Sequence, residues 1–137
     1  FFKSACSAQR TLKGTLSSKV KAYKKKVDLQ IFVYPDADDP SSRAIKIHMT
    51  KAGVGECQRP LRAETMQGPR VAIADSESIE KGSWIEFDVV VLDEGDWDLV
   101  KEWLDYGRFN GLGQWRNSGK GAFVWHEINH KPTTIFK

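Results

Sequence analysis

Residues 107–121 read GRFNGLGQWRNSGKG, and five of these fifteen positions are glycine. Because glycine has no Cβ, it can adopt φ > 0 and lets the main chain approach a ligand or a second backbone segment closely. Outward backbone N–H groups with cations and an aromatic ring beside them suit a polyanion that carries stackable bases. We expect this stretch to lie between a helix and the last strand, so the rest of the chain is interpreted around it.

Two familiar phosphate-binding motifs are excluded by the order of residues. A Walker loop requires Ser or Thr after Gly119-Lys120, but Gly121 stands there, and the expected helix precedes the loop instead of following it. A dinucleotide-binding fingerprint fails for the same reason. A flexible linker remains an alternative, although linkers of that kind favour Gly and Ser without bulky aromatic residues.

Gly111-Leu112-Gly113 and Gly119-Lys120-Gly121 are separated by five residues and give the pattern G-h-G-x5-G-x-G. The pattern resembles the glycine-rich loop near the C-terminus of the RAMP superfamily, the CRISPR-associated RNA-binding proteins. With the expected flanking helix and strand, the resemblance extends over 83–128. It implies a ferredoxin-like (RRM-like) α+β sheet with helices on one face, and self-association or a multi-subunit nucleoprotein complex. Short single-domain bacteriophage proteins are similar too, so no CRISPR locus is implied.

Length and composition indicate one folded domain over residues 1–137. Hydrophobic residues make up 40% and charged residues 28% of the chain, which is typical of a folded protein. No apolar run approaches about eighteen residues and no signal peptide is evident, so we expect no membrane association and a cytoplasmic location. The chain begins at Phe1 without Met, and we expect it to lack a preceding first strand of a longer polypeptide.

Charge is strongly segregated along the chain. Residues 1–26 hold eight Lys and Arg and no acid, whereas 75–105 hold eleven acids and two lysines. We expect the basic N-terminus and the glycine-rich stretch to form one polyanion-binding surface. The candidate nucleic-acid-binding residues are Lys13, Lys19, Lys21, Lys24, Lys25, Lys26, Arg108, Gly111, Gly113, Trp115, Arg116, Gly119, Lys120 and Gly121.

Periodicity predicts helices over 1–10 and 94–106, the second with a buried stripe that includes Val100 and Trp103. Gly107 is expected to end that helix in the left-handed conformation. Residues 11–26 and 51–69 are expected to be irregular, the second as a long excursion between strands.

Alternation of apolar residues predicts the strands. They are expected over 27–34, 43–50, 71–74, 83–92 and 122–128. The first two would form a hairpin with each other. In 83–92, Ile85, Phe87, Val89 and Val91 are expected to face the core. Residues 129–137 are expected to form a tail.

The candidates for chemistry are sparse. His48, His126 and His130 are the only titrating groups suited to acid–base catalysis near neutral pH. The catalytic histidine of RAMP ribonucleases usually lies in or near the first helix, and residues 1–10 contain none. Cys6 and Cys57 have no metal-ligand spacing and are interpreted as structural thiols. We therefore expect no metal and no cofactor, and a binding protein more than an enzyme.

The favoured interpretation is a protein that binds single-stranded RNA or DNA with little sequence preference. Arg108, Arg116 and Lys120 would contact phosphates, and Trp115 would stack on a base. One alternative is a RAMP-type metal-independent endoribonuclease that uses one of the histidines. Another is a phage protein-interaction module that acts on a CRISPR-type effector through the acidic residues 75–105.

Overall fold

The computed structural model describes residues 1–39, 41–49, 55–113, 116 and 119–129, and within them it is a mixed α+β protein. The helical elements are α1 (Phe2–Gln9), the 3-10 turn η1 (Ser17–Lys19), α2 (Tyr23–Gln30), the 3-10 turn η2 (Glu94–Asp96) and α3 (Trp97–Tyr106). The strands are β1 (Ile31–Tyr34), β2 (Ile47–His48), β3 (Gly55–Thr65), β4 (Gly68–Ser78), β5 (Trp84–Ile85) and β6 (Asp88–Val91).

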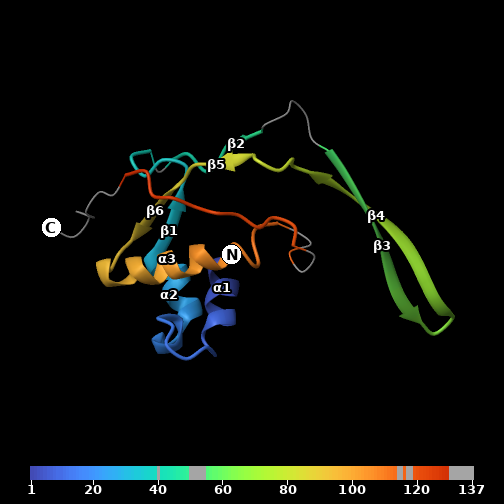
Figure 1. Cartoon of the computed structure of the whole chain (residues 1–137), viewed down its shortest axis with the longest axis horizontal. Coiled ribbons are helices and arrows are strands. Elements are labelled where there is room, and N and C mark those ends of the chain that lie inside the picture. The colour runs from blue at the N-terminus through green and yellow to red at the C-terminus, as the bar shows by residue number, and fades with distance from the viewer. Residues whose placement is uncertain (40, 50–54, 114–115, 117–118, 130–137) are drawn as a thin grey trace.

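The strands pair into three two-stranded antiparallel ladders, β1 with β6, β2 with β5 and β3 with β4. α1 and α3 lie next to the β1–β6 ladder in the body of the molecule, and the β3–β4 hairpin projects away from it (Figure 1). The hairpin expected between 27–34 and 43–50 is therefore wrong. Ile31 pairs instead with Val91, and because both are only 5% exposed, this register buries both strands in one core.

The core forms where α1 and α3 pack against one face of the β1–β6 ladder. Its buried members are Ala5, Cys6, Ile31, Val91, Leu99, Val100, Trp103 and Leu104. The four contributed by α3 recur at helical spacing, as the sequence predicts, and Trp103 and Val100 are fully buried. The helices expected over 1–10 and 94–106 are thus confirmed as α1 and as η2 with α3.

A carboxylate on α3 holds the segment that precedes α2. Glu102 accepts hydrogen bonds from the backbone N–H groups of Leu16 and Ser17, at 2.7 and 3.0 Å, and from the Ser17 hydroxyl. The fully buried Ser17 Oγ accepts in turn from the Trp103 indole at 3.0 Å. These bonds attach η1 to the core. The irregular loop expected over 11–26 is therefore confirmed only at 11–16 and 20–22, because 17–19 form η1 and α2 begins at Tyr23.

The first predicted strand also begins later than expected. α2 continues to Gln30, and the strand starts at Ile31. Tyr23 and Val27 are four residues apart on α2 and both pack against the core cluster. The alternation that suggested a strand from Val27 included Leu29, which is 65% exposed.

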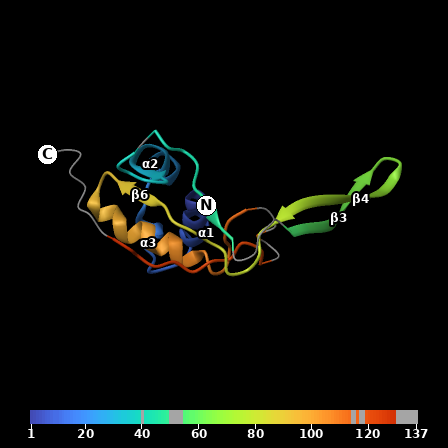
Figure 2. The same cartoon turned by 90° about the horizontal axis from the view of Figure 1, so that it is seen from above.

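Residues 51–69 were expected to be irregular, and the described part of this region contradicts that expectation. β3 and β4 form a hairpin of two eleven-residue strands, which we call the arm. At its tip Gly68 has φ +104°, and the Thr65 hydroxyl donates to the Gly68 carbonyl at 2.6 Å. The arm extends well clear of the helices when it is seen from above (Figure 2). The short strand expected at 71–74 is the middle of β4.

The strand expected over 83–92 is confirmed in part, because it is divided into β5 and β6. Phe87, Val89 and Val91 do contact the core or belong to it. Ile85 is not among the residues that pack against the core; it is half-buried and pairs with Ile47 in the β2–β5 ladder, next to Trp84, which stacks on His48.

The last strand, expected over 122–128, is absent from the structure, which is described there up to residue 129. Phe123 and Trp125 instead pack against the core, and the Trp125 indole donates to Asp105 Oδ1 at 2.8 Å. The segment is held by the end of α3 and not by a sheet edge. The Gly107 carbonyl accepts from the backbone N–H of Phe123 at 3.0 Å.

Gly107 itself has φ −58°, so the expected left-handed stop is wrong. A Cβ at this position would lie 2.3 Å from the Phe123 ring. Glycine is therefore needed for close packing and not for its backbone angles. No helix in the described part of the chain is long and apolar enough to cross a membrane.

Candidate nucleic-acid interface

The glycine-rich stretch closes on itself through backbone contact. The Leu112 N–H donates to the Gly121 carbonyl at 3.0 Å. A Cβ on Gly111 would lie 1.7 Å from that carbonyl oxygen, and a Cβ on Gly121 would lie 1.8 Å from the Leu112 oxygen. Only glycine fits at 111 and 121, so the first and last turns of the G-h-G-x5-G-x-G pattern have a structural explanation. We call this contact the glycine crossing.

Gly113 and Gly119 have a different environment. Their φ angles are +86° and +78°, and none of the residues that the structure describes lies within 4 Å of a Cβ placed on either of them. As far as these described residues go, a ligand has room to approach the backbone there. Arg108 and Lys120 are exposed, while Arg116 is half-buried. Trp115, the expected stacking residue, lies outside the described residues.

Arg116 lies near the start of α1, since its charge acts on the group at Phe1. Lys3, in the first turn of α1, forms a salt bridge with Asp28 of α2 at 2.6 Å, so its charge is already paired.

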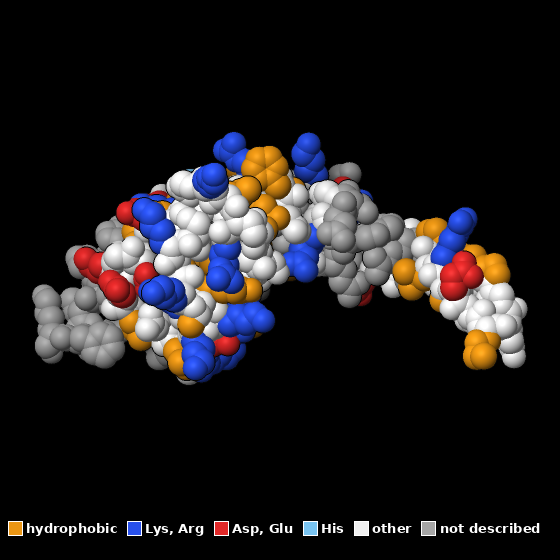
Figure 3. Space-filling model, turned by 90° about the horizontal axis from the view of Figure 1, so that it is seen from below, with side chains coloured by type: hydrophobic (Ala, Val, Ile, Leu, Met, Phe, Trp, Pro, Cys, Tyr) orange, Lys and Arg blue, Asp and Glu red, His pale blue; other side chains and the backbone are white. Residues whose placement is uncertain are grey.

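The N-terminal lysines divide into exposed ones and ones held in salt bridges, and the second group includes Lys3 and Lys26. Lys13, Lys19, Lys21, Lys24 and Lys25 are exposed, and we call them the lysine face. Several Lys and Arg side chains spread over the end of the molecule built from α1, η1 and α2, with few carboxylates among them (Figure 3). Lys26 is different, because it forms a salt bridge with Asp96 at 2.7 Å in which its side chain is only 25% exposed. We therefore assign Lys26 to the fold and not to ligand contact.

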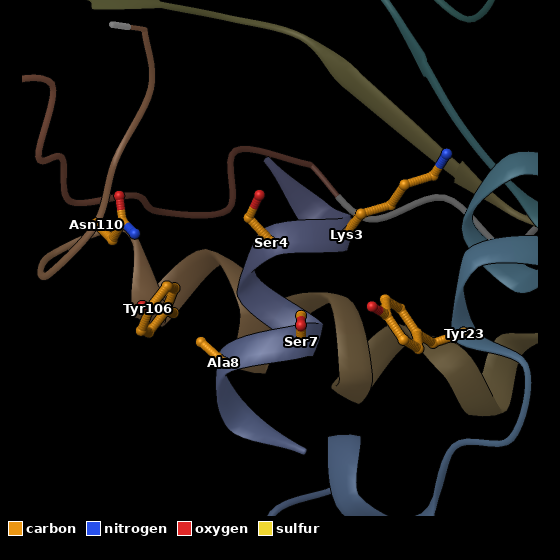
Figure 4. Close-up of a pocket in the computed structure, with 7 residues that line it drawn as sticks. All are labelled: Lys3, Ser4, Ser7, Ala8, Tyr23, Tyr106 and Asn110. Atoms are coloured by element: carbon orange, nitrogen blue, oxygen red, sulfur yellow. The ribbon is translucent and has the colours of Figure 1, made fainter. Parts of the chain in front are cut away.

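A shallow groove of about 440 Å³ crosses the outer side of α1. It is lined by Lys3, Ser4, Ser7, Ala8, Tyr23, Tyr106 and Asn110. Its floor is made of small α1 side chains, and a tyrosine stands at each side, Tyr23 from α2 and Tyr106 from α3 (Figure 4). One end of the groove thus adjoins the helix that carries Lys24 and Lys25, and the other adjoins the start of the glycine-rich stretch.

Aromatic and polar groups at the groove were missed from the sequence. The Tyr106 ring lies 6.5 Å from the ring of Phe109, which is 76% exposed. At the other side, the guanidinium of Arg10 lies 4.7 Å above the Tyr23 ring. Asn110 Oδ1 is buried and has no hydrogen-bond partner in the part of the chain that the structure describes. Phe109, an exposed aromatic residue beside Arg108 in a polar stretch, was the sequence signal that could have identified this site.

The candidate catalytic histidines are not brought together by any described contact. The His48 ring stacks on Trp84, with centroids 3.8 Å apart and planes within 7°. His126 is exposed, and His130 lies outside the described residues. Among the residues that the structure describes, no group of three or more His, Cys, Asp or Glu is placed to hold a metal ion. Cys6 is a free, buried thiol, as predicted.

Comparison with known protein families, curated proteins and solved structures finds no match to this chain. Its function is therefore argued from the groove, the lysine face and the glycine-rich stretch.

Proposed function

We propose that the protein binds single-stranded RNA or DNA, with little sequence preference, along the groove over α1. The observation that carries the proposal is that this groove joins the two segments that the sequence marks as basic. Exposed lysines would follow the phosphates at one end, and Arg108 and Lys120 would do so at the other. Tyr23, Tyr106 and Phe109 would offer ring faces to the bases.

The chemistry of these groups supports a ligand with both charge and stackable rings. Stacking of a base on an aromatic side chain contributes about 1–3 kcal/mol and tolerates any base. Each phosphate contact on a single strand contributes about −0.7 to the slope of log affinity against log salt. If all five residues of the lysine face take part, that slope approaches about −3.5.

We also propose that the fold belongs with the RAMP-like, ferredoxin-like proteins. The order α1, β1, β6, α3, with α1 and α3 on one face of an antiparallel strand pair, supports this proposal. Self-association along a nucleic-acid strand would follow from the same resemblance.

The first test is the fluorescence anisotropy of labelled single-stranded RNA and DNA oligomers across a salt series. The double variant Lys24→Gln, Lys25→Gln should flatten the salt slope by about 1.4, because two phosphate contacts are lost. Lys46→Gln is the matched control, since Lys46 is exposed but lies outside the lysine face. If the double variant and the control bind alike, the lysine face is not the binding surface.

A second set of variants tests the aromatic groups. Phe109→Ala should weaken binding about tenfold for every oligomer sequence while leaving the salt slope unchanged. Trp84→Ala is its control, because Trp84 is an exposed aromatic residue on a different element. The same reactions, sampled over time, report whether RNA stays intact; cleavage would support the endoribonuclease alternative. If wild type binds neither oligomer at low salt, the protein-interaction alternative takes precedence.

A further inference from the structure

The arm presents one face whose side chains follow a charge order along its length. Directly opposed residues of an antiparallel pair share a face, as do alternate residues along each strand. From base to tip, the rungs of this face are Glu56 with Glu77, Gln58 with Asp75, Pro60 with Ile73, Arg62 with Val71, and Glu64 with Pro69. The face therefore begins with acids, is apolar at its centre and has Arg62 beyond the centre.

The apolar centre is open to solvent. Ile73 is 70% exposed and Val71 is 62% exposed, although both lie in the middle of a strand. A hairpin of two strands without further packing is marginally stable in water. At the base, Glu56 stands directly opposite Glu77, and like charges at opposed positions destabilise a strand pair. The exposed apolar centre calls for an occupant with an apolar centre of its own, and Asp75, one rung from it, calls for a positive charge nearby.

We propose that this occupant is the same face of a second copy of the chain. When two copies pack antiparallel about a two-fold axis through the Pro60–Ile73 rung, the two Ile73 side chains meet at the centre. Arg62 of each copy then faces the rung of Gln58 and Asp75 of the other, with Gln58 directly opposite and Asp75 diagonal to it, within reach of the long arginine side chain. The three central rungs of the face are thus complementary to themselves in both apolar character and charge.

The match is confined to the three central rungs. One rung further out, Glu64 of one copy approaches Glu56 and Glu77 of the other, where like charges repel. About six side chains per copy then bury roughly 1,000 Å² in total, at the low end of specific interfaces. The dimer is therefore weak, with a dissociation constant in the micromolar range or above.

Sedimentation equilibrium of the nuclease-treated full chain, over a concentration series that reaches the high micromolar range, tests the proposal. The wild type should be a monomer–dimer equilibrium. Arg62→Asp should weaken dimerisation about tenfold or more, and the double variant Arg62→Asp, Asp75→Arg should restore it. Arg70→Asp makes the same charge change on the opposite face, opposed to Ala63, and should leave dimerisation unchanged.

Glu64→Lys provides a test that misfolding cannot imitate. The new lysine would meet Glu56 and Glu77 of the second copy, so dimerisation should tighten about tenfold. A monomer at every concentration, a charge swap that fails to restore the dimer, or a Glu64→Lys variant no tighter than wild type would each overturn the proposal. Tryptophan fluorescence reports the fold of the body in every variant, because the arm contains no tryptophan.

Discussion

Substituting Gly111 by alanine should open the glycine crossing, and the expected cost can be worked out from the structure. The added Cβ would lie 1.7 Å from the Gly121 oxygen, whereas real Cβ contacts are essentially never below 3.0 Å. The two backbone segments must separate by about 1.3 Å, which breaks the hydrogen bond between the Leu112 N–H and Gly121. Phe123, two residues after the crossing, would move with its segment out of its contact with the core.

We expect Gly111→Ala to lower the free energy of unfolding by about 3 kcal/mol, from the lost hydrogen bond and the displaced packing. For a chain of this length, that lowers Tm by about 10 °C. Gly113→Ala is the matched control. Gly113 also stands in the motif, but its Cβ would meet none of the described residues within 4 Å, so the expected cost comes from the left-handed φ of +86°, about 1 kcal/mol.

Urea unfolding followed by tryptophan fluorescence measures both variants against the wild type. Oligomer binding measured below the Tm of each variant then separates the two roles of glycine. Gly113→Ala should weaken oligomer binding with only a small loss of stability. Gly111→Ala should weaken binding and also lower the stability of the fold. If the two variants were equally stable, the glycine crossing would not contribute to the stability of the fold, and the reasoning would be refuted.

Three further outcomes follow from contacts within the body. Glu102→Ala should destabilise the fold by about 2–4 kcal/mol, because two backbone N–H groups lose a charged acceptor; the exposed Glu86→Ala should change it by less than about 0.5 kcal/mol in the same urea titration. Lys26→Ala should lower the free energy of unfolding by about 1–2 kcal/mol because its salt bridge is lost, but it should leave the salt slope of oligomer binding unchanged. A flattened slope would show instead that Lys26 contacts the ligand. Burial raises the pKa of the Cys6 thiol, so the stability that its protonated form contributes is present at neutral pH and is lost as pH rises above the ordinary thiol value of about 8.5. In a Cys57→Ser background, alkylation of native Cys6 at about that pH should be much slower than in urea, and equal rates would contradict its burial.

The sequence predicted the parts of the fold whose side-chain pattern has a single explanation. The stripe on α3 has helical spacing, and Val100 and Trp103 are buried as that spacing requires. The hairpin expected between 27–34 and 43–50 failed because alternation shows which face of a strand is buried but does not identify its partner. Val89 and Val91 lie more than fifty residues from β1 in the sequence. They pair with β1 because both strands bury side chains in the same core.

The arm and the η1 segment could not be predicted from the sequence. Their regular structure depends on contacts with distant residues, and such contacts leave little trace in local composition. Residues 55–65 include proline and several charges, and they form a strand because β4 supplies a partner at every rung. Ser17 looks like a loop residue until Glu102 is brought beside it.

The candidate site was predicted in part. The lysine face and the glycine-rich stretch were identified, but Tyr23 and Tyr106 were not, because each also contacts the core. A residue that both packs against the core and lines the groove shows the same sequence pattern as a residue that only packs against the core.

The β2–β5 ladder has a consequence for how the chain tolerates length changes. His48 already stands opposite Trp84, so the chain leaves the body and returns to it at neighbouring points before and after the arm. The body should therefore accept removal of residues 50–82 and their replacement by a two-residue turn, since neither the β1–β6 register nor the core uses them. Shortening this connection lowers the entropy lost in closing it by about 2 kcal/mol. The arm is in this sense a separable insertion, and its length is free to vary without refolding the helices and strands that carry it.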